Sequence, residues 1–385
     1  MTAVSDPSTT RAPADRCPGL LRPFLADDGA LVRLRMPGGR VAPSVLSEVV
    51  AIAERFGAPV VQMTSRGNLQ VRALPSPLPP AFVEAIEATG LLPSATHERV
   101  RNVVAAPLAR ELDGMVAAFD AALVADPVLA RLPGRFLFAF SDASGSVLSE
   151  RWDIAYQQFS ADSGVVYAGG LASEVALGDA VPAMIDAARR FVEIAPEGAW
   201  NVRDLPPTLL PDLLPSWDTP REAPKRPNRA IRRPLRPGVV GPDVVAGVPL
   251  GMLTRQHVAA FAEVAGPDAP AVVTAWRSVV VRDGAARVDV LRDAGLVIEA
   301  AGPWSRLSAC VGAPSCRRTT VPTLDLARSA AELVAARRLP STQDVHVVGC
   351  ERRCGTGVSD HVLVAPPTVD HVVTSLTQVP IGGET

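Results

Sequence analysis

The 385-residue sequence has very little lysine, tyrosine and cysteine: one lysine, two tyrosines and five cysteines. Lys225 is the single lysine, so the basic residues are almost all arginines, yet the formal net charge is only −2. A net charge this close to zero gives no indication of binding to nucleic acid or to an anionic membrane surface. The sequence also contains no basic recognition helix. We therefore expect neither a nucleic-acid partner nor a membrane partner.

Long hydrophobic runs are also absent. Every apolar stretch is interrupted by a charge, a proline or a glycine within about 18 residues, the length that a membrane-spanning helix requires. The first residues, Met1 to Ser8, have neither the basic start nor the apolar segment of a signal peptide. We therefore expect a soluble cytoplasmic protein, in which thiols stay reduced and can bind a metal.

Four of the five cysteines lie in two short loops near the C-terminal end. Five residues separate Cys310 from Cys316, and three separate Cys350 from Cys354. The segment between the two loops is predicted to form one helix and one strand, so the four thiolates can meet at one point. Thiolates suit either zinc or an iron–sulfur cluster. The wide first gap, which contains a glycine and a proline, favours a [4Fe-4S] cluster over a zinc knuckle.

The same cysteine pattern could arise from disulfides, from a zinc site or from four unrelated buried cysteines. Disulfides are not expected, because thiols stay reduced in the cytoplasm. Unrelated cysteines disagree with the grouping of four residues in two short loops. The spacing of the cysteines leaves zinc as an alternative metal. Cys17, the fifth cysteine, is predicted to be a structural thiol rather than a further ligand.

The pattern Ala-Cys-x5-Cys followed by Gly-Cys-x3-Cys-Gly resembles the cluster motif of the sulfite and nitrite reductase superfamily. The resemblance implies a [4Fe-4S] cluster held by Cys310, Cys316, Cys350 and Cys354. In the siroheme reductases the last of these cysteines also bridges to the tetrapyrrole iron. Those reductases usually carry Pro-Asn between the last two cysteines, where this chain has Glu351 and Arg352. Siroheme is therefore the less expected cofactor.

An internal repeat supports the resemblance. The turn at Pro37, a helix from Ser44 to Phe56, a strand and the segment 64–72 are matched by a turn at Pro249, a helix after Thr254, a strand and the segment 274–281. Counting from the two turns pairs Arg66 with Arg277. Alignment of the two Ala-Pro dipeptides, at 106–107 and 313–314, places Val103 opposite Cys310, so the first copy lacks ligands and only one cluster can form.

The expected fold class is α/β (α+β), an internally duplicated nitrite/sulfite reductase-like fold with pseudo-two-fold symmetry. Each copy has a ferredoxin-like half-domain followed by an α/β lobe. The predicted divisions are a disordered N-terminus (1–15), a first half-domain (16–95), a first lobe without a cluster (96–205), a Pro-rich linker (206–238), a second half-domain (239–300) and a cluster lobe (301–385).

Three arginine-containing segments resemble those that supply basic residues to the tetrapyrrole carboxylates in this superfamily. They are Thr64-Ser65-Arg66, Arg101-Asn102 and Leu132-Pro133-Gly134-Arg135. Guanidinium groups hold carboxylates by paired hydrogen bonds, which is why arginine suits this task. We predict catalytic roles for Arg66, Arg101 and Arg135. The predicted substrate-binding residues are Arg66, Asn68, Arg72, Arg101, Asn102, Arg135 and Arg277.

One departure from the reductases narrows the activity. Leu137 occupies a position where sulfite reductases carry a second lysine, and six-electron reduction of an anion needs a dense positive pocket. The compact length and the segment from Cys17 to Arg35 resemble the precorrin-3B synthases, the branch of the superfamily that acts in cobalamin biosynthesis.

This resemblance implies an oxygen-dependent monooxygenase that hydroxylates precorrin-3A with lactone formation. Its partners would be precorrin-3A, dioxygen and an electron donor such as ferredoxin or an NADH-linked reductase. A mononuclear non-haem iron is a further cofactor to consider, with His97 and His346 nearest to the motifs. The alternatives are a siroheme-dependent sulfite or nitrite reductase and a non-catalytic iron–sulfur electron-transfer or sensor protein.

Overall fold

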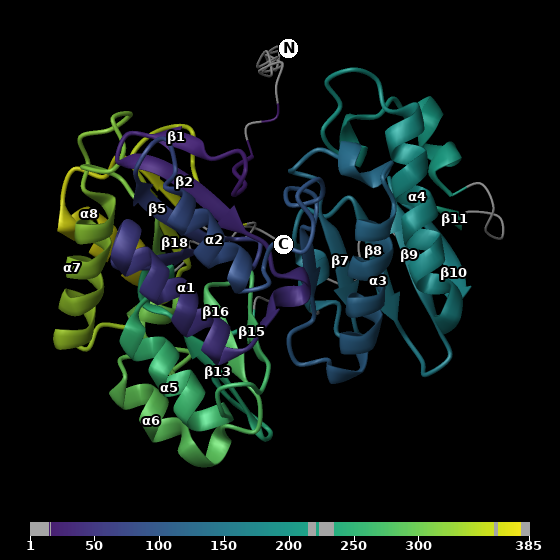
Figure 1. Cartoon of the computed structure of the whole chain (residues 1–385). Helices are drawn as coiled ribbons and strands as arrows, with labels where there is room; N and C mark the ends of the chain where they lie inside the picture. Colours follow the sequence, from purple (N-terminus) through teal and green to yellow (C-terminus); the bar gives the residue numbers. More distant parts are fainter. Residues whose placement is uncertain (1–14, 16, 215–220, 223–234, 358–360, 379–385) are drawn as a thin grey trace, which may run out of the picture.

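The computed structural model describes residues 15, 17–214, 221–222, 235–357 and 361–378. Strands in these residues form two five-stranded sheets, one six-stranded sheet and one three-stranded sheet. Figure 1 shows the C-terminal lobe, with helices α7 and α8, on one side of the N-terminal sheet and the lobe with α3 and α4 on the other. None of the helices in the described part of the chain is long and apolar enough to cross a membrane.

The first half-domain is an antiparallel sheet covered by two helices. Its strands in spatial order are β1 (Phe24–Ala26), β2 (Gly29–Leu34), β5 (Leu69–Leu74) and β4 (Val61–Met63). Its helices are α1 (Pro43–Phe56) and α2 (Pro80–Ala88). Helix α1 begins at a proline rather than at a Ser44 cap, because the Ser44 hydroxyl bonds to Asp268 instead. It ends at Phe56, just before Gly57, as expected.

The second half-domain repeats this plan. Its strands in spatial order are β12 (Gly238–Val240), β13 (Asp243–Gly247), β16 (Ser278–Val281) and β15 (Ala271–Val273). Its helices are α5 (Arg255–Ala265) and α6 (Val288–Asp293). Thr254 caps α5 as expected, since its side chain accepts a hydrogen bond from the His257 N–H.

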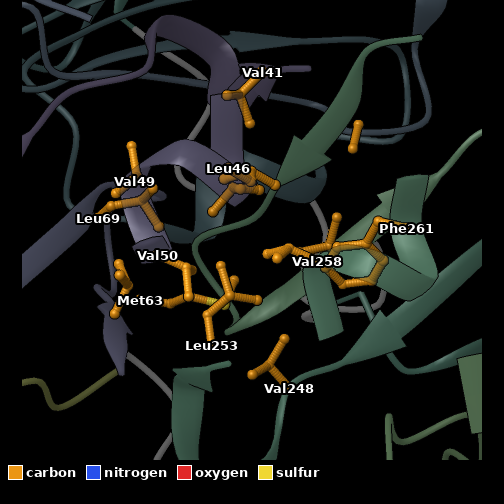
Figure 2. Close-up of a cluster of buried hydrophobic side chains, with 14 of the residues drawn as sticks. Val41, Leu46, Val49, Val50, Met63, Leu69, Val248, Leu253, Val258 and Phe261 are labelled. Atoms are coloured by element: carbon orange, nitrogen blue, oxygen red, sulfur yellow. The ribbon is translucent and has the colours of Figure 1, made fainter. Parts of the chain in front are cut away.

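The two half-domains exchange one short strand each. Strand β3 (Arg40–Val41) of the first pairs with β15 of the second, and β14 (Met252–Leu253) of the second pairs with β4 of the first. Helices α1 and α5 pack together, and Figure 2 shows their side chains, among them Leu46 and Phe261, meeting in one core. A shared core excludes two independent modules on a tether.

Each half-domain is followed by a lobe built on three parallel strands. In the first lobe these are β6 (Val103–Ala105), β7 (Phe138–Ser141) and β8 (Ile154–Gln158). Antiparallel strands β9 (Ser163–Ala168), β10 (Leu171–Ala176) and β11 (Arg221–Glu222) extend that sheet, and its helices are α3 (Asp113–Ala125) and α4 (Ala180–Ile194). The cysteine lobe has β17 (Leu307–Ala309), β18 (Val345–Val348) and β19 (His361–Val364), with α7 (Thr323–Ala336) and α8 (Val369–Thr377).

The repeat is real, but the structure shifts its pairing. The N–H of Thr64 donates to the Asn68 carbonyl at 2.9 Å, and the N–H of Thr274 donates to the Ser278 carbonyl at 2.9 Å. These matched turns make Trp276 the counterpart of Arg66, while Arg277 is the counterpart of Gly67. Pairing Arg66 with Arg277 was therefore wrong by one position. Thr64 lies 64−37 = 27 residues after Pro37, whereas Thr274 lies 274−249 = 25 residues after Pro249, because α5 is three residues shorter than α1 and the loop after it is one residue longer.

The loop alignment needs a similar correction. The N–H of Ala106 donates to the Phe140 carbonyl at 2.8 Å, and the N–H of Cys310 donates to the Val347 carbonyl at 2.9 Å. Ala106, not Val103, is thus the counterpart of Cys310. The Ala-Pro dipeptide misled the alignment because it lies further beyond the strand in the longer cysteine loop. The first copy still has no cysteine at this position.

The predicted N-terminus and linker fall largely outside the described part of the chain. The predicted disorder at 1–15 and most of the predicted linker lie at residues 1–14, 16, 215–220 and 223–234, outside the described part. The linker's first part forms a 3-10 helix, Pro207–Leu213, and Leu213 and Leu214 are buried in the core of the first lobe. This part is packed rather than extended.

Candidate functional site

A row of polar side chains crosses one face of the first sheet. Arg33, Gln70 and Gln62 are register partners on β2, β5 and β4, so their side chains share a face. The Nη2 of Arg33 donates to Gln70 Oε1 at 3.4 Å, and Gln70 Nε2 donates to Gln62 Oε1 at 2.8 Å. We call Arg33, Gln70 and Gln62 the polar row.

The polar row faces the cysteine lobe. Met252 on the exchanged strand is the register partner of Gln62 and packs against the core of that lobe. Arg72 lies two residues beyond Gln70 on β5, and its Nη2 is 3.5 Å from the carbonyl of Ser315, in the loop between the first two cysteines. The row therefore has the cysteine loops on one side.

At its Arg33 end the polar row meets three further arginines. Within the described residues, no ion pair involves Arg33, Arg35, Arg66 or Arg135, and we call these four the unpaired arginines. Arg66 Nη1 instead donates to the Arg135 carbonyl at 2.8 Å, and the Arg135 guanidinium lies 4.7 Å from the centre of the Trp200 ring. The Nε of Arg33 and the Nη2 of Arg35 are buried and have no hydrogen-bond partner among the described residues.

These guanidinium groups repel one another. Burial lowers the pKa of Arg33, and the neighbouring charges of Arg66 and Arg135 lower it further. Burial also lowers the pKa of Arg66, and it lowers the pKa of Arg35 to about 9. Arginine stays charged at neutral pH even so. The charges of Glu98 and Asp153 act in the opposite sense on Arg35 and Arg66, although neither carboxylate forms an ion pair with them among the described residues. Partly buried cations without an ion-pair partner are costly, so this arrangement is typical of a site that receives an anionic ligand.

Two of the predicted substrate-binding arginines have protein partners instead. Arg101 makes a paired bridge to Asp120 on α3 at 2.8 and 2.7 Å, with its side chain only 8% exposed. Arg72 makes a similar pair with Asp28 at 3.1 and 2.9 Å. Each of these two guanidinium groups therefore already makes its paired hydrogen bonds to a carboxylate of the protein. We therefore assign Arg101 a structural role, and give Arg72 the role of linking the first sheet to the cysteine loop.

The two predicted asparagines, Asn68 and Asn102, form buried hydrogen bonds that link the segments of the site. Asn68 and Asn102 are fully buried. Asn102 Oδ1 accepts from Arg35 Nε at 3.0 Å and from Asn68 Nδ2 at 3.2 Å, and its amide donates to the Gly134 carbonyl at 3.0 Å. These bonds tie β2 and the turn after β4 to the loop before Arg135, which orders the unpaired arginines.

The N-terminal segment closes one end of this region. The Asp15 carboxylate accepts hydrogen bonds from the Gly134 N–H at 2.7 Å and from Arg99 at 3.0 Å. Cys17 follows on this segment, and burial together with the Asp15 charge raises the pKa of its thiol. Arg33 and Arg35 lie within electrostatic range and act in the opposite sense. Cys17 therefore lies beside the unpaired arginines.

The four remaining cysteines come from two adjacent loops. Cys310 follows β17 and Cys350 follows the neighbouring β18, and the N–H of Gly349 donates to the Cys310 sulfur at 3.4 Å. Burial raises the pKa of Cys354, and the charges of the other three thiols raise it further, against Arg352. All three thus lie within electrostatic range of Cys354.

Two side chains support the second cysteine loop. His346 is fully buried, with Nδ1 at 2.7 Å from Ser308 Oγ and Nε2 at 2.9 Å from the Cys354 carbonyl. Arg277 donates to the Gly355 carbonyl at 2.5 Å. His97 likewise has both ring nitrogens within hydrogen-bond distance of protein groups, among them the Asp126 carbonyl at 2.9 Å. Both histidines therefore make structural contacts, and these contacts identify no ligand for the mononuclear iron considered from the sequence.

The cysteine loops offer sulfur donors to the two kinds of metal site predicted from the sequence. In the described residues no group of three or more His, Cys, Asp or Glu side chains is arranged to hold one metal ion. A zinc site would need all four sulfurs around one ion. In a [4Fe-4S] cluster each thiolate binds a different iron, so the sulfurs stay further apart. Four cysteines on adjacent loops provide the thiolate donors that either kind of site requires, and the Gly349 N–H already donates to one of them.

A small apolar pocket lies where the turn of the second half-domain meets the first copy. It is lined by Trp276, the counterpart of Arg66, and by Val104 and Ala105 of β6. Gly38 and Gly39 also line it. None of the described residues that line this pocket is charged, in contrast to the arginines around Arg66.

Comparison with known protein families and solved structures identifies the fold class of the chain. Residues 25–88 match the family described as "Nitrite/Sulfite reductase ferredoxin-like half domain". The NirA protein of Mycobacterium tuberculosis superposes with a TM-score of 0.67, covering 85% of this chain and 69% of that chain, at 19% sequence identity. The chain therefore has the nitrite/sulfite reductase-like fold, which confirms the predicted fold class.

A more particular relative is a precorrin-3B synthase from Sinorhizobium sp. It is 26% identical over 385 residues, covering 91% of this chain and 81% of that protein. The resemblance predicted from the cysteine motif is thus confirmed, and with it the prediction that the chain is an enzyme. The oxidoreductase class is consistent with the fold.

Proposed function

We propose that the protein is an oxygen-dependent monooxygenase that hydroxylates precorrin-3A, with lactone formation, in cobalamin biosynthesis. The similarity to precorrin-3B synthase supports the substrate class. One structural observation carries the proposal further: the unpaired arginines and the polar row lie between the N-terminal segment and the cysteine loops. A tetrapyrrole rich in carboxylates supplies the counter-charges that these guanidinium groups lack.

The residues of the site have separate tasks in this proposal. Arg33, Arg66 and Arg135 hold carboxylates along one edge of the macrocycle. Gln62 and Gln70 offer neutral hydrogen bonds across its face, which orients the ring without adding charge. Fixed donors of this kind place the reacting carbon and exclude bulk water from it. Arg101 contributes indirectly, because its bridge to Asp120 fixes the backbone that carries Asn102.

The cysteine loops complete the site. Cys310, Cys316, Cys350 and Cys354 would hold a [4Fe-4S] cluster, which supplies single electrons when bound. The loop's own groups tune that position: the Gly349 N–H donates to the Cys310 sulfur, and His346 anchors the backbone at Cys354. Dioxygen and an electron donor such as ferredoxin or an NADH-linked reductase complete the proposed partners.

Turnover with labelled oxygen tests the proposal. Anaerobically purified protein would be mixed with precorrin-3A, a chemical reductant and ¹⁸O₂, and the product analysed by mass spectrometry. Incorporation of a single labelled oxygen into a lactone product is expected. Unchanged precorrin-3A in protein that contains iron and acid-labile sulfide would overturn the proposal and leave an electron-transfer or sensor role.

A siroheme-dependent reductase is the second candidate, favoured by the fold it shares with NirA. Leu137 argues against it, because this buried apolar side chain occupies the position of an expected cation. The visible spectrum separates the two. Intense siroheme bands in the purified protein would favour the reductase, whereas a broad cluster absorption alone would favour the monooxygenase.

A further inference from the structure

We propose that the turn Trp200–Asp204 is a positioning element for the substrate's carboxylates, acting through Arg135 and Arg66. This inference rests on the proposed function and adds residues to it that neither the motif nor the repeat indicated. Arg135 is exposed and has no carboxylate partner in the described residues. Its guanidinium carbon lies 4.7 Å from the centre of the Trp200 ring, so this ring orients the guanidinium group. A cation over an indole face is a favourable, directional contact.

The same turn fixes the backbone of Arg135. Asn201 Nδ2 lies 3.5 Å from the Arg135 carbonyl and donates to Asp153 Oδ2 at 3.1 Å. That carbonyl also accepts from Arg66 Nη1 at 2.8 Å. Trp200 therefore orients one arginine through its side chain, while Asn201 orients the acceptor that a second arginine uses.

Asp153 clamps the turn to the lobe. This buried carboxylate accepts from the Leu137 N–H at 2.9 Å and from the Val202 N–H at 2.8 Å, in addition to Asn201. Asp204 closes the turn from the other side, because its Oδ2 accepts from the N–H groups of Trp200 at 3.0 Å and Asn201 at 2.9 Å. A turn with this many fixed bonds is rigid, as a positioning element must be.

The turn also contributes charge. Arg203 Nη2 donates to Asn201 Oδ1 at 2.6 Å, and its charge is near enough to Arg66 to help lower the pKa of that residue. The positive cluster therefore extends past the first lobe strands to residue 203. The chemical class this edge receives is a carboxylate on the rim of a macrocycle, bound between Arg66, Arg135 and Arg203.

The test compares Trp200→Leu with Trp200→Phe in the full-length protein. Uroporphyrin, in which every pyrrole carries two carboxylate side chains, serves as the probe, and its Kd is measured by equilibrium dialysis. Loss of the cation–π contact with Arg135 is expected to raise the Kd of Trp200→Leu about fivefold. Trp200→Phe keeps an aromatic face and should recover most of the affinity. Phe56→Leu removes the aromatic partner of a cation–π pair elsewhere, Arg55–Phe56 at 4.8 Å, and should leave the Kd unchanged.

A double-mutant cycle separates positioning from a general loss of structure. If Trp200 acts only through Arg135, then Arg135→Ala alone and Arg135→Ala combined with Trp200→Leu will have the same Kd. Equal Kd values for wild type and Trp200→Leu would overturn the inference while leaving the proposed function intact. Additive losses in the cycle would overturn it too. Failure of the wild type to bind uroporphyrin would instead contradict the proposed function itself.

Discussion

The two half-domains have the same strands but opposite surfaces on corresponding faces. Strand register makes Val245, Val272 and Val280 of the second sheet the counterparts of Arg33, Gln62 and Gln70 of the first. The three valines are fully buried and form a small core with Leu108 and Leu235, whereas the polar row lies beside arginines that lack counter-ions among the described residues.

The difference teaches how a duplicated fold keeps one site. In the first sheet the corresponding face carries charged and polar side chains, which in this account contact a ligand. In the second sheet it carries valines, which pack against other parts of the protein. The lobes differ in the matching way, because Ala106 stands where Cys310 stands in the second copy. Charge in one copy and cysteine in the other meet at the same place, between the first sheet and the cysteine lobe.

The largest expected effect comes from the cysteines that distinguish the two lobes. Replacing Cys310, Cys316, Cys350 or Cys354 by serine should abolish the cluster, since serine is a poor substitute for a thiolate ligand. Iron and acid-labile sulfide in anaerobically purified protein measure the result. Cys17→Ser is the matched control and should keep both at the wild-type level. Equal loss in all five variants would contradict the assignment.

Making the second sheet resemble the first should be strongly destabilising. Val245→Arg places a cation in a cluster whose described members are all apolar, so we expect the free energy of unfolding to fall by about 3–5 kcal/mol. Val245→Leu, which stays apolar, should cost less than about 2 kcal/mol. Denaturant unfolding measures both. An Arg variant as stable as the Leu variant would show that the two faces are not distinct.

The reverse change should not destabilise the first sheet. Arg33→Val removes a poorly compensated cation, so the free energy of unfolding should stay constant or rise by about 1 kcal/mol. Arg101→Met breaks a bridge and leaves Asp120 without its partner, so it should lower that free energy by about 2 kcal/mol. Thermal and denaturant unfolding without ligand give the comparison. A large loss in Arg33→Val would assign Arg33 to the fold rather than to a site.

The smallest effect concerns how the matched helices begin. Helix α5 is capped by Thr254, whereas α1 begins at Pro43 without a side-chain cap. Thr254→Ala should therefore lower the free energy of unfolding by about 1 kcal/mol, because it removes the acceptor for the His257 N–H. Ser44→Ala, at the predicted but unformed cap of α1, should change it by less than about 0.5 kcal/mol. Denaturant unfolding of the two variants gives both values, and equal losses would contradict the difference in capping.

The sequence predicted much of this organisation. The repeat, the Thr254 cap and the helix and strand between the cysteine loops follow from periodicity and turn residues, which are local signals. The exchange of β3 and β14 could not be predicted, since a two-residue strand has no pattern of its own. The pairing of Arg66 failed for a related reason: helices of different length shift a count made from a distant turn.

The candidate site was predicted only in part. The motif pointed to Arg66 and Arg135, but Arg101 lay in the same kind of segment and is neutralised by Asp120, a partner 19 residues away. Arg33 was visible only as a charge in an alternating strand, which is typical of a solvated face. What sets it apart is that no described carboxylate pairs with it, and that depends on the folded structure.

The most direct test of the central claim is an equilibrium dialysis of uroporphyrin against the wild type and Arg33→Val. If the polar face of the first sheet is an anion site for a carboxylated macrocycle, the wild type will bind saturably, more weakly at high salt. The Kd of Arg33→Val will then be raised about tenfold or more. Equal Kd values for the two proteins, or no saturable binding by the wild type, would contradict it.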